Sequence, residues 1–148
     1  MSGDLDLLQA ALAAEHAAIY GYGLLGAHLR GAQQQTATAL WEAHRSRRDR
    51  LAGLVTGLGG TPVAAQPAYR LPVQVTSART AVQLAASLEQ AVLNGYVGLA
   101  GATAPALRVL AAQAMQDATI RQVRWSGTAT TTAFPGLGQT APSPRSGQ

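Results

Sequence analysis

The chain has 148 residues, of which 47% are hydrophobic, 12% charged and 5% aromatic, and its formal net charge is +4. This length suits one domain with a sizeable core. Because the chain contains no cysteine, disulfides, thiolate metal sites and cysteine nucleophiles are excluded. The positive charge is an excess of only four over seven acidic residues, which does not by itself indicate a nucleic-acid partner.

The N-terminal residues MSGDLDLLQA have no basic start followed by a continuous apolar run, so they do not resemble a signal peptide. No uninterrupted apolar run reaches the roughly 18 residues that a membrane-spanning helix needs. We therefore expect a cytoplasmic protein without a membrane partner.

Two helices are predicted in the first part of the chain, because apolar residues recur there at steps of three and four. The first is expected over residues 4–30, with Leu8 and Leu12 on its buried face, and the second over residues 33–58, after a turn at Gly31. Glycines within the first helix indicate close approach by a neighbouring helix.

Residues 59–76 contain three prolines and are predicted to be an extended connection. Extended, they would reach about 55 Å, whereas a helix of 25 residues is about 37 Å long. The connection is therefore long enough to cross the whole length of a helical bundle, and it makes the helices before and after it parallel.

Two further helices are predicted over residues 77–100, with Ser77 as N-terminal cap, and over residues 104–126, with Pro105 in the first turn. Residues 1–126 are thus expected to form an all-α four-helix bundle. Residues 127–148 are predicted to be a Pro/Thr/Gly-rich tail, whose Phe134 folds back on the bundle. No internal repeat is evident by sequence identity.

Each apolar face contains one ionisable residue near its middle: Glu15, His44, Glu89 and Asp117. An ionised side chain in a core is costly unless it is paired or binds a ligand. Counting residues outward from each turn predicts which side chains lie at the same height on adjacent antiparallel helices. Glu15 is expected at the height of Arg47 or Arg48, and Glu89 at the height of Asp117. The face of the fourth helix that leads to Asp117 is Leu107, Leu110 and Ala114.

Four helices with one long crossover between the second and third resemble the ferritin-like bundle. That resemblance implies glutamates on helices 1 and 3, where Glu15 and Glu89 fit, and a Glu-x-x-His motif on helices 2 and 4. In helix 2 His44 is present, but Trp41 stands in the glutamate position. In helix 4 Asp117 replaces glutamate and Ile120 stands in the histidine position.

More closely, the chain resembles an Ala-rich ferritin-like family of unknown function from high-GC bacteria. The stretches that carry this resemblance are AEHAAIYGYG, AHRSRRDRL, TPVAAQPAYRLP, LEQAVLNGY and AFPGL. The resemblance implies the bundle but no established activity.

Two functions remain open. The favoured one is a non-catalytic binding or structural module with a degenerate metal site and no cofactor, in which Arg47, Arg48, Arg121 and Tyr96 form a structural polar core with the ionisable residues. There Glu15 pairs with Arg47 or Arg48, and Glu89 pairs with His44. Asp117 pairs with Arg121 or Arg124. The alternative is a mononuclear metal-binding or redox protein that holds iron, manganese or zinc. Its ligands would be Glu15, His44, Glu89 and Asp117.

Neither nucleic acid nor catalysis by a serine–histidine pair is supported by a motif. The arginines of HRSRRDR, residues 44–50, spread around the helix instead of lining one side. The small residues Ala10, Ala14, Ala17 and Gly21 are expected to form a flat exposed surface on helix 1 for a homodimer or another protein partner.

Overall fold

The computed structural model describes residues 3–127, and the predicted tail with Phe134 lies almost entirely outside them. Within this range the chain folds into four long helices, and a short 3-10 turn follows the first and the third. The elements are α1 (Asp4–Leu25), η1 (Gly26–His28), α2 (Gly31–Gly57), α3 (Ala78–Val97), η2 (Gly98–Gly101) and α4 (Pro105–Ser126). The predicted all-α bundle is therefore confirmed.

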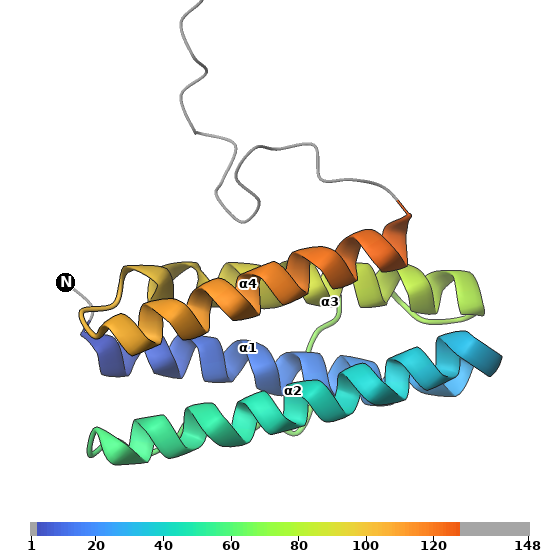
Figure 1. Ribbon diagram of the computed structural model, residues 1–148. Helices are drawn as coiled ribbons and strands as arrows, with labels where there is room; N and C mark the ends of the chain where they lie inside the picture. Colours follow the sequence, from blue (N-terminus) through green and yellow to red (C-terminus); the bar gives the residue numbers. More distant parts are fainter. Residues whose placement is uncertain (1–2, 128–148) are drawn as a thin grey trace, which may run out of the picture.

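The helices are arranged around a central pair, α1 and α3 (Figure 1). Helix α2 packs against α1 and helix α4 against α3, whereas the backbones of α2 and α4, both fully described, do not approach each other closely. The crossover from α2 to α3 returns along the bundle, so these two helices run in the same direction (Figure 1). The seam between α2 and α4 is consequently bridged by side chains, among them Arg47 and Asp117.

The central pair comes close together because each helix has a glycine at the contact. Gly21 on α1 faces the side chain of Leu88, and Gly95 on α3 faces Ala14, whose methyl group a Cβ atom at Gly95 would overlap. Ala14 and Gly21 are therefore part of the contact with α3. The prediction that they form an exposed surface for a partner is wrong for these two residues.

The crossover is held along the outer side of α1 by side chains of that helix. The Gln9 amide bonds to the backbone of Thr61 and Val63, at 2.6 and 2.8 Å, and His16 Nε2 lies 2.9 Å from the Val63 carbonyl oxygen. Further along the crossover, half-buried Leu71, Val73 and Val75 pack against the core. The connection therefore covers the bundle although it has no regular secondary structure.

Polar caps begin the two helices of the second half of the chain. Ser77 caps α3 in a reciprocal capping box with Thr80, as its sequence predicts. Asp4, from the start of α1, accepts hydrogen bonds from the backbone amides of Thr103 and Ala104 just before α4. These two hydrogen bonds lower the pKa of Asp4, and they tie the first helix to the beginning of the last.

Candidate functional site

Three of the four predicted ionisable residues meet in the middle of the bundle and are almost completely buried. The exposed fractions of Glu15, His44 and Glu89 are 0%, 1% and 0%. The His44 imidazole lies between the two carboxyl groups, with Nδ1 2.6 Å from Glu15 Oε2 and Nε2 3.0 Å from Glu89 Oε1. One imidazole from α2 thus joins a glutamate of α1 to a glutamate of α3.

Aromatic side chains extend this arrangement at both ends. The Tyr96 hydroxyl donates to Glu15 Oε1 and the Tyr22 hydroxyl donates to Glu89 Oε1, each at 2.6 Å. Trp125 Nε1 in turn donates to the Tyr22 hydroxyl oxygen at 3.0 Å. The result is a continuous chain of hydrogen bonds to which all four helices contribute. We call it the central network, and its members are Trp125, Tyr22, Glu89, His44, Glu15 and Tyr96.

The charges in the central network follow from its hydrogen bonds. Burial alone would lower the pKa of His44, but the hydrogen bonds to Glu15 and Glu89 outweigh burial and raise the pKa to about 9. At neutral pH both ring nitrogens therefore carry protons and donate. Burial, together with the negative charge of the neighbouring glutamate, raises the pKa of both Tyr22 and Tyr96, so both phenols remain protonated donors.

One carboxyl oxygen of the central network accepts no hydrogen bond from the described residues. Glu89 Oε2 is buried and has no hydrogen-bond partner among the described residues, whereas both carboxyl oxygens of Glu15 are bonded. An unpaired buried polar atom costs about 1–3 kcal/mol. Glu89 is therefore the less well satisfied of the two glutamates.

The residues present do not fit the two-metal centre that the ferritin-like plan implies. A protonated imidazole has no lone pair for a metal, and both nitrogens of His44 are already bonded to carboxyl groups. Within residues 3–127, no group of three or more His, Cys, Asp and Glu side chains is arranged to hold a metal ion. The centre of the bundle is occupied by hydrogen bonds among its own side chains.

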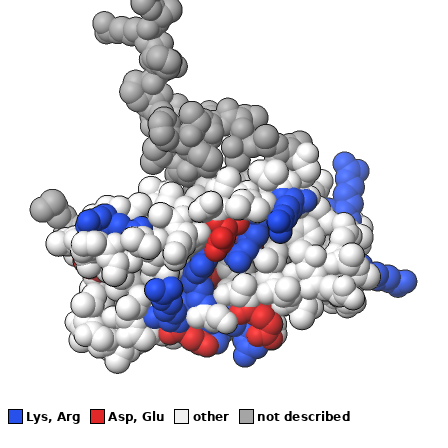
Figure 2. All heavy atoms as spheres, in the orientation of Figure 1, with Lys and Arg blue, Asp and Glu red and all other residues white. Residues whose placement is uncertain are grey.

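Asp117, the fourth predicted ligand, lies apart from the other three. Its partly exposed carboxylate accepts a hydrogen bond from Arg47 Nη2 at 3.1 Å, on the face where charged side chains gather between α2 and α4 (Figure 2). The buried face of α4 continues from Ala114 to Ala118, four residues further along. The sequence pattern predicts instead that it continues to Asp117, three residues after Ala114. Asp117 therefore lies at the edge of that face, outside the core, and its carboxylate pairs with Arg47, not with Arg121 or Arg124.

The predicted pairing of Glu15 with Arg47 or Arg48 is also wrong. Helix α2 begins at Gly31, earlier than the predicted residue 33, and the turn before it is centred near residues 29 and 30. This moves the residues of α2 by about one helical turn relative to α1, so His44 faces Glu15. The predicted pairing of Glu89 with His44 is present.

The predicted structural polar core is found only in part. Tyr96 belongs to the central network, whereas Arg48 binds Asp49 at the surface at 2.9 Å. Arg47 and Arg121 are partly buried, and their positive charges act on the Tyr96 phenol in the direction opposite to burial, lowering its pKa. These two arginines therefore lie beside the network without belonging to its hydrogen-bond chain.

The two halves of the bundle share a short repeat. Glutamate, five residues, glycine and tyrosine occur as Glu15-x5-Gly21-Tyr22 and again 74 positions later as Glu89-x5-Gly95-Tyr96. The same offset separates the first residues of α1 and α3, numbers 4 and 78, and those of α2 and α4, numbers 31 and 105. The same offset also relates Leu25 to Leu99, Arg47 to Arg121 and Arg50 to Arg124. The repeat therefore extends through both halves, with its identities scattered among residues that differ.

The repeated residues pair crosswise between the halves. The Tyr22 hydroxyl donates its hydrogen bond to the glutamate of α3, and the Tyr96 hydroxyl donates to the glutamate of α1. The symmetry is broken at the histidine, because the residue 74 positions after His44 is the buried Ala118. A single imidazole is therefore shared by two glutamates.

A family described as a domain of unknown function, DUF4439, matches residues 7–139. The chain belongs to this family. The match includes all members of the central network and continues past the end of α4, into the region predicted to be a tail. No curated protein matches the chain significantly.

Two solved structures show similar folds. A conserved hypothetical protein from Mycobacterium tuberculosis is 32% identical with a TM-score of 0.81, and the alignment covers 86% of this chain and 98% of that one. A ferritin-like, diiron-carboxylate protein from Bacillus anthracis str. Ames is 23% identical with a TM-score of 0.68, with the same coverage of 86% and 98%. The second likeness shows a shared fold alone, and the predicted ferritin-like bundle is confirmed.

Proposed function

We propose that this DUF4439 protein is a non-catalytic binding or structural module in which the central network stands where a ferritin-like protein would carry metal. The observation that carries this proposal is the His44 imidazole between Glu15 and Glu89, at 2.6 and 3.0 Å. An imidazolium offsets carboxylate charge in the core without any bound ion. The network would then serve to fix the register of the four helices, and no cofactor would be needed.

The competing hypothesis is a mononuclear site for iron, manganese or zinc, formed by Glu15, His44, Glu89 and Asp117. It has one supporting observation, the buried and unpaired Glu89 Oε2. It also requires two changes: His44 must lose its proton, and Asp117 must leave Arg47. We therefore rank it second.

Two measurements on the untagged protein separate these hypotheses. Long-range nitrogen–proton NMR spectra at pH 7.5 should show both His44 nitrogens protonated, with His16 and His28 in the same spectrum as internal references. Elemental analysis should find no stoichiometric metal, and added iron, manganese or zinc should leave the melting temperature unchanged. A metal-induced rise in melting temperature that the His44→Ala variant abolishes would refute the proposal.

We further propose that the protein acts in the cytoplasm and through contact with protein, either a second copy of itself or another partner. The described helices include none long and apolar enough to cross a membrane. Ala10, from the surface predicted for a partner, remains exposed. Sedimentation velocity over a range of protein concentrations tests self-association, and a monomer at all of them would exclude the homodimer.

A further inference from the structure

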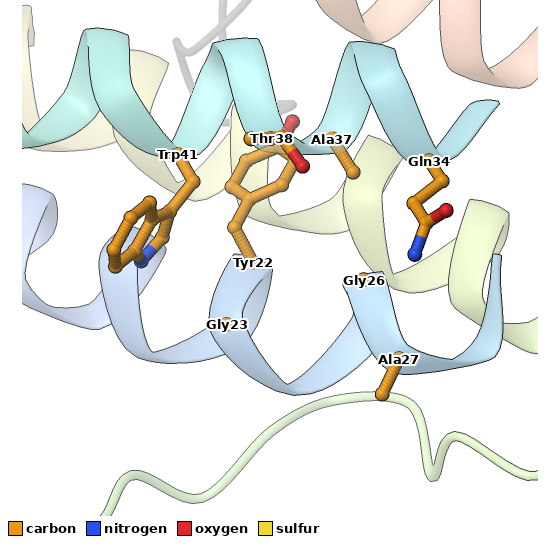
Figure 3. A pocket seen from close by; sticks show the side chains of 8 residues that line it. All are labelled: Tyr22, Gly23, Gly26, Ala27, Gln34, Ala37, Thr38 and Trp41. Atoms are coloured by element: carbon orange, nitrogen blue, oxygen red, sulfur yellow. The ribbon is translucent and has the colours of Figure 1, made fainter. Parts of the chain in front are cut away.

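A pocket of about 310 Å³ opens between α1 and α2, and Tyr22 is the one member of the central network among its lining residues. Figure 3 shows Trp41 and Gln34 extending from α2 toward α1 at its two ends, with Tyr22 rising from α1 between them. We call this cavity the α1–α2 pocket. Small residues complete its lining. Its members are Tyr22, Gly23, Gly26, Ala27, Gln34, Ala37, Thr38 and Trp41.

Two glycines create the hollow, and the fold itself does not require them. A Cβ atom at Gly23 would come no closer than 3.8 Å to a neighbour, and one at Gly26 would meet nothing within 4 Å. Neither glycine has a positive backbone φ angle, and glycine within a helix is destabilising relative to alanine. Gly21 differs, because it is needed for the contact with Leu88. The absence of side chains at Gly23 and Gly26 therefore keeps the space above them empty.

The polar groups around the α1–α2 pocket define what it can hold. The Trp41 indole nitrogen lies 3.8 Å from the position of a Cβ at Gly23, and within the described residues neither it nor the side chains of Gln34 and Thr38 has a hydrogen-bond partner. None of the lining residues carries a charge, and the Tyr22 hydroxyl is already bonded to Glu89. The Arg45 guanidinium lies 4.4 Å from the centre of the Trp41 ring, but it is already paired with Glu42 at 3.3 Å. A charged ligand would thus lose its hydration without gaining an unpaired counter-ion, which is unfavourable.

We propose that the α1–α2 pocket binds a small, uncharged aromatic molecule that carries a hydrogen-bond acceptor. The ring lies over Gly23 and Gly26 between Tyr22 and Trp41, and the acceptor receives a hydrogen bond from the Trp41 indole or the Gln34 amide. The volume lies at the lower end of the range of ligand pockets, which limits the ligand to about one substituted ring. This site is separate from the metal question, so its test is independent of the proposed function.

Benzamide is the matching probe, with benzoate and benzylammonium as anionic and cationic analogues of nearly the same size. The chain has two tryptophans, so its spectrum contains two indole N–H signals, which the Trp41→Phe variant assigns. We expect benzamide to shift the Trp41 signal more than the Trp125 signal, with a Kd on the order of 1 mM, typical of a weak fragment. Both charged analogues should bind at least about tenfold more weakly.

Variants test whether the shift arises in the pocket. Gly26→Leu fills the hollow and should abolish benzamide binding, whereas the same change at the exposed Gly101, where a Cβ also meets nothing within 4 Å, should leave binding unchanged. Gln34→Met, which keeps the length of the side chain and removes one of the two donors assigned to the ligand, is the milder second variant and should weaken binding. The proposal is overturned if benzamide does not shift Trp41, if all three probes bind equally, or if Gly26→Leu binds like the wild type.

Discussion

Raising the pH from 6 to 9.5 should destabilise the folded protein by discharging His44. The native pKa of His44 is about 9, above its ordinary value of 6.5. A group whose pKa is raised by folding stabilises the native state fully below its unfolded pKa, and this stabilisation is lost as the pH rises through the native pKa. The loss is therefore expected between about pH 6.5 and pH 9.

The size of the effect follows from the two pKa values. They differ by about 2.5, and one pKa unit corresponds to about 1.4 kcal/mol, so the free energy of unfolding should fall by about 3 kcal/mol. Domains of this kind are stable by about 5–15 kcal/mol in total, so the change is a large part of the whole. With an m-value of about 2 kcal/mol per M for urea, the unfolding midpoint should drop by about 1.5 M.

Urea unfolding followed by circular dichroism at several pH values measures this directly. The His44→Gln variant keeps a neutral hydrogen-bond donor but does not titrate, so its stability should change little over the same pH range. His28→Gln, at an exposed histidine, should retain the wild-type pH dependence. Equal pH dependence in the wild type and in His44→Gln, or a wild-type protein that is more stable at pH 9.5, would refute the assignment of an imidazolium to the network.

Three further substitutions test individual contacts. Tyr96→Phe removes the donor to one buried carboxyl oxygen and should destabilise the protein by about 1–3 kcal/mol in urea unfolding. Gly95→Ala inserts a methyl group against Ala14 and should cost about 1–3 kcal/mol through overpacking, seen as a lower melting temperature. Asp117→Asn weakens a partly exposed ion pair with Arg47 and should change the free energy of unfolding by less than about 1 kcal/mol.

Two of these substitutions have a matched control. Tyr69→Phe changes a tyrosine of the crossover, outside the network, and should matter less than the change at Tyr96. In Gly23→Ala the new methyl group makes only an ordinary contact, 3.8 Å from the Trp41 indole nitrogen, so this change should stabilise α1 by up to about 1 kcal/mol. A neutral effect at Tyr96, a stabilising alanine at Gly95 or a large loss at Asp117 would each contradict the packing described for that residue.

The sequence was sufficient to predict the fold because its signals are local. The steps of three and four in apolar residues, the cap at Ser77 and the proline-containing crossover each act over a few residues, and together they predicted four helices in the observed order. The helix ends were less well predicted, since glycines near residue 26 favour a 3-10 turn before the loop. An error of a few residues there shifted the predicted level of His44 by one turn.

The site was predicted in part, for a physical reason. A charged residue on an apolar face must find a partner, so Glu15, His44 and Glu89 could be identified as buried without knowing their contacts. Asp117 was misplaced because the buried face can continue from Ala114 either to Asp117 or to Ala118. Alanines occur on both the buried and the exposed sides of this helix, so the sequence does not distinguish the two continuations. The roles of Tyr22 and Trp125 depend on contacts 67 and 103 positions away along the chain, which no local pattern contains.

The crosswise pairing of the repeated residues affects how the protein can fold. Each helical hairpin carries a glutamate whose phenol partner, and a glycine whose close neighbour, are in the other hairpin. A hairpin on its own would therefore lack the phenol donor to its glutamate and would leave the surface around its glycine uncovered. Neither half has a stable structure to retain when the other is lost, so the bundle should unfold as one cooperative unit, without a half-folded intermediate at equilibrium.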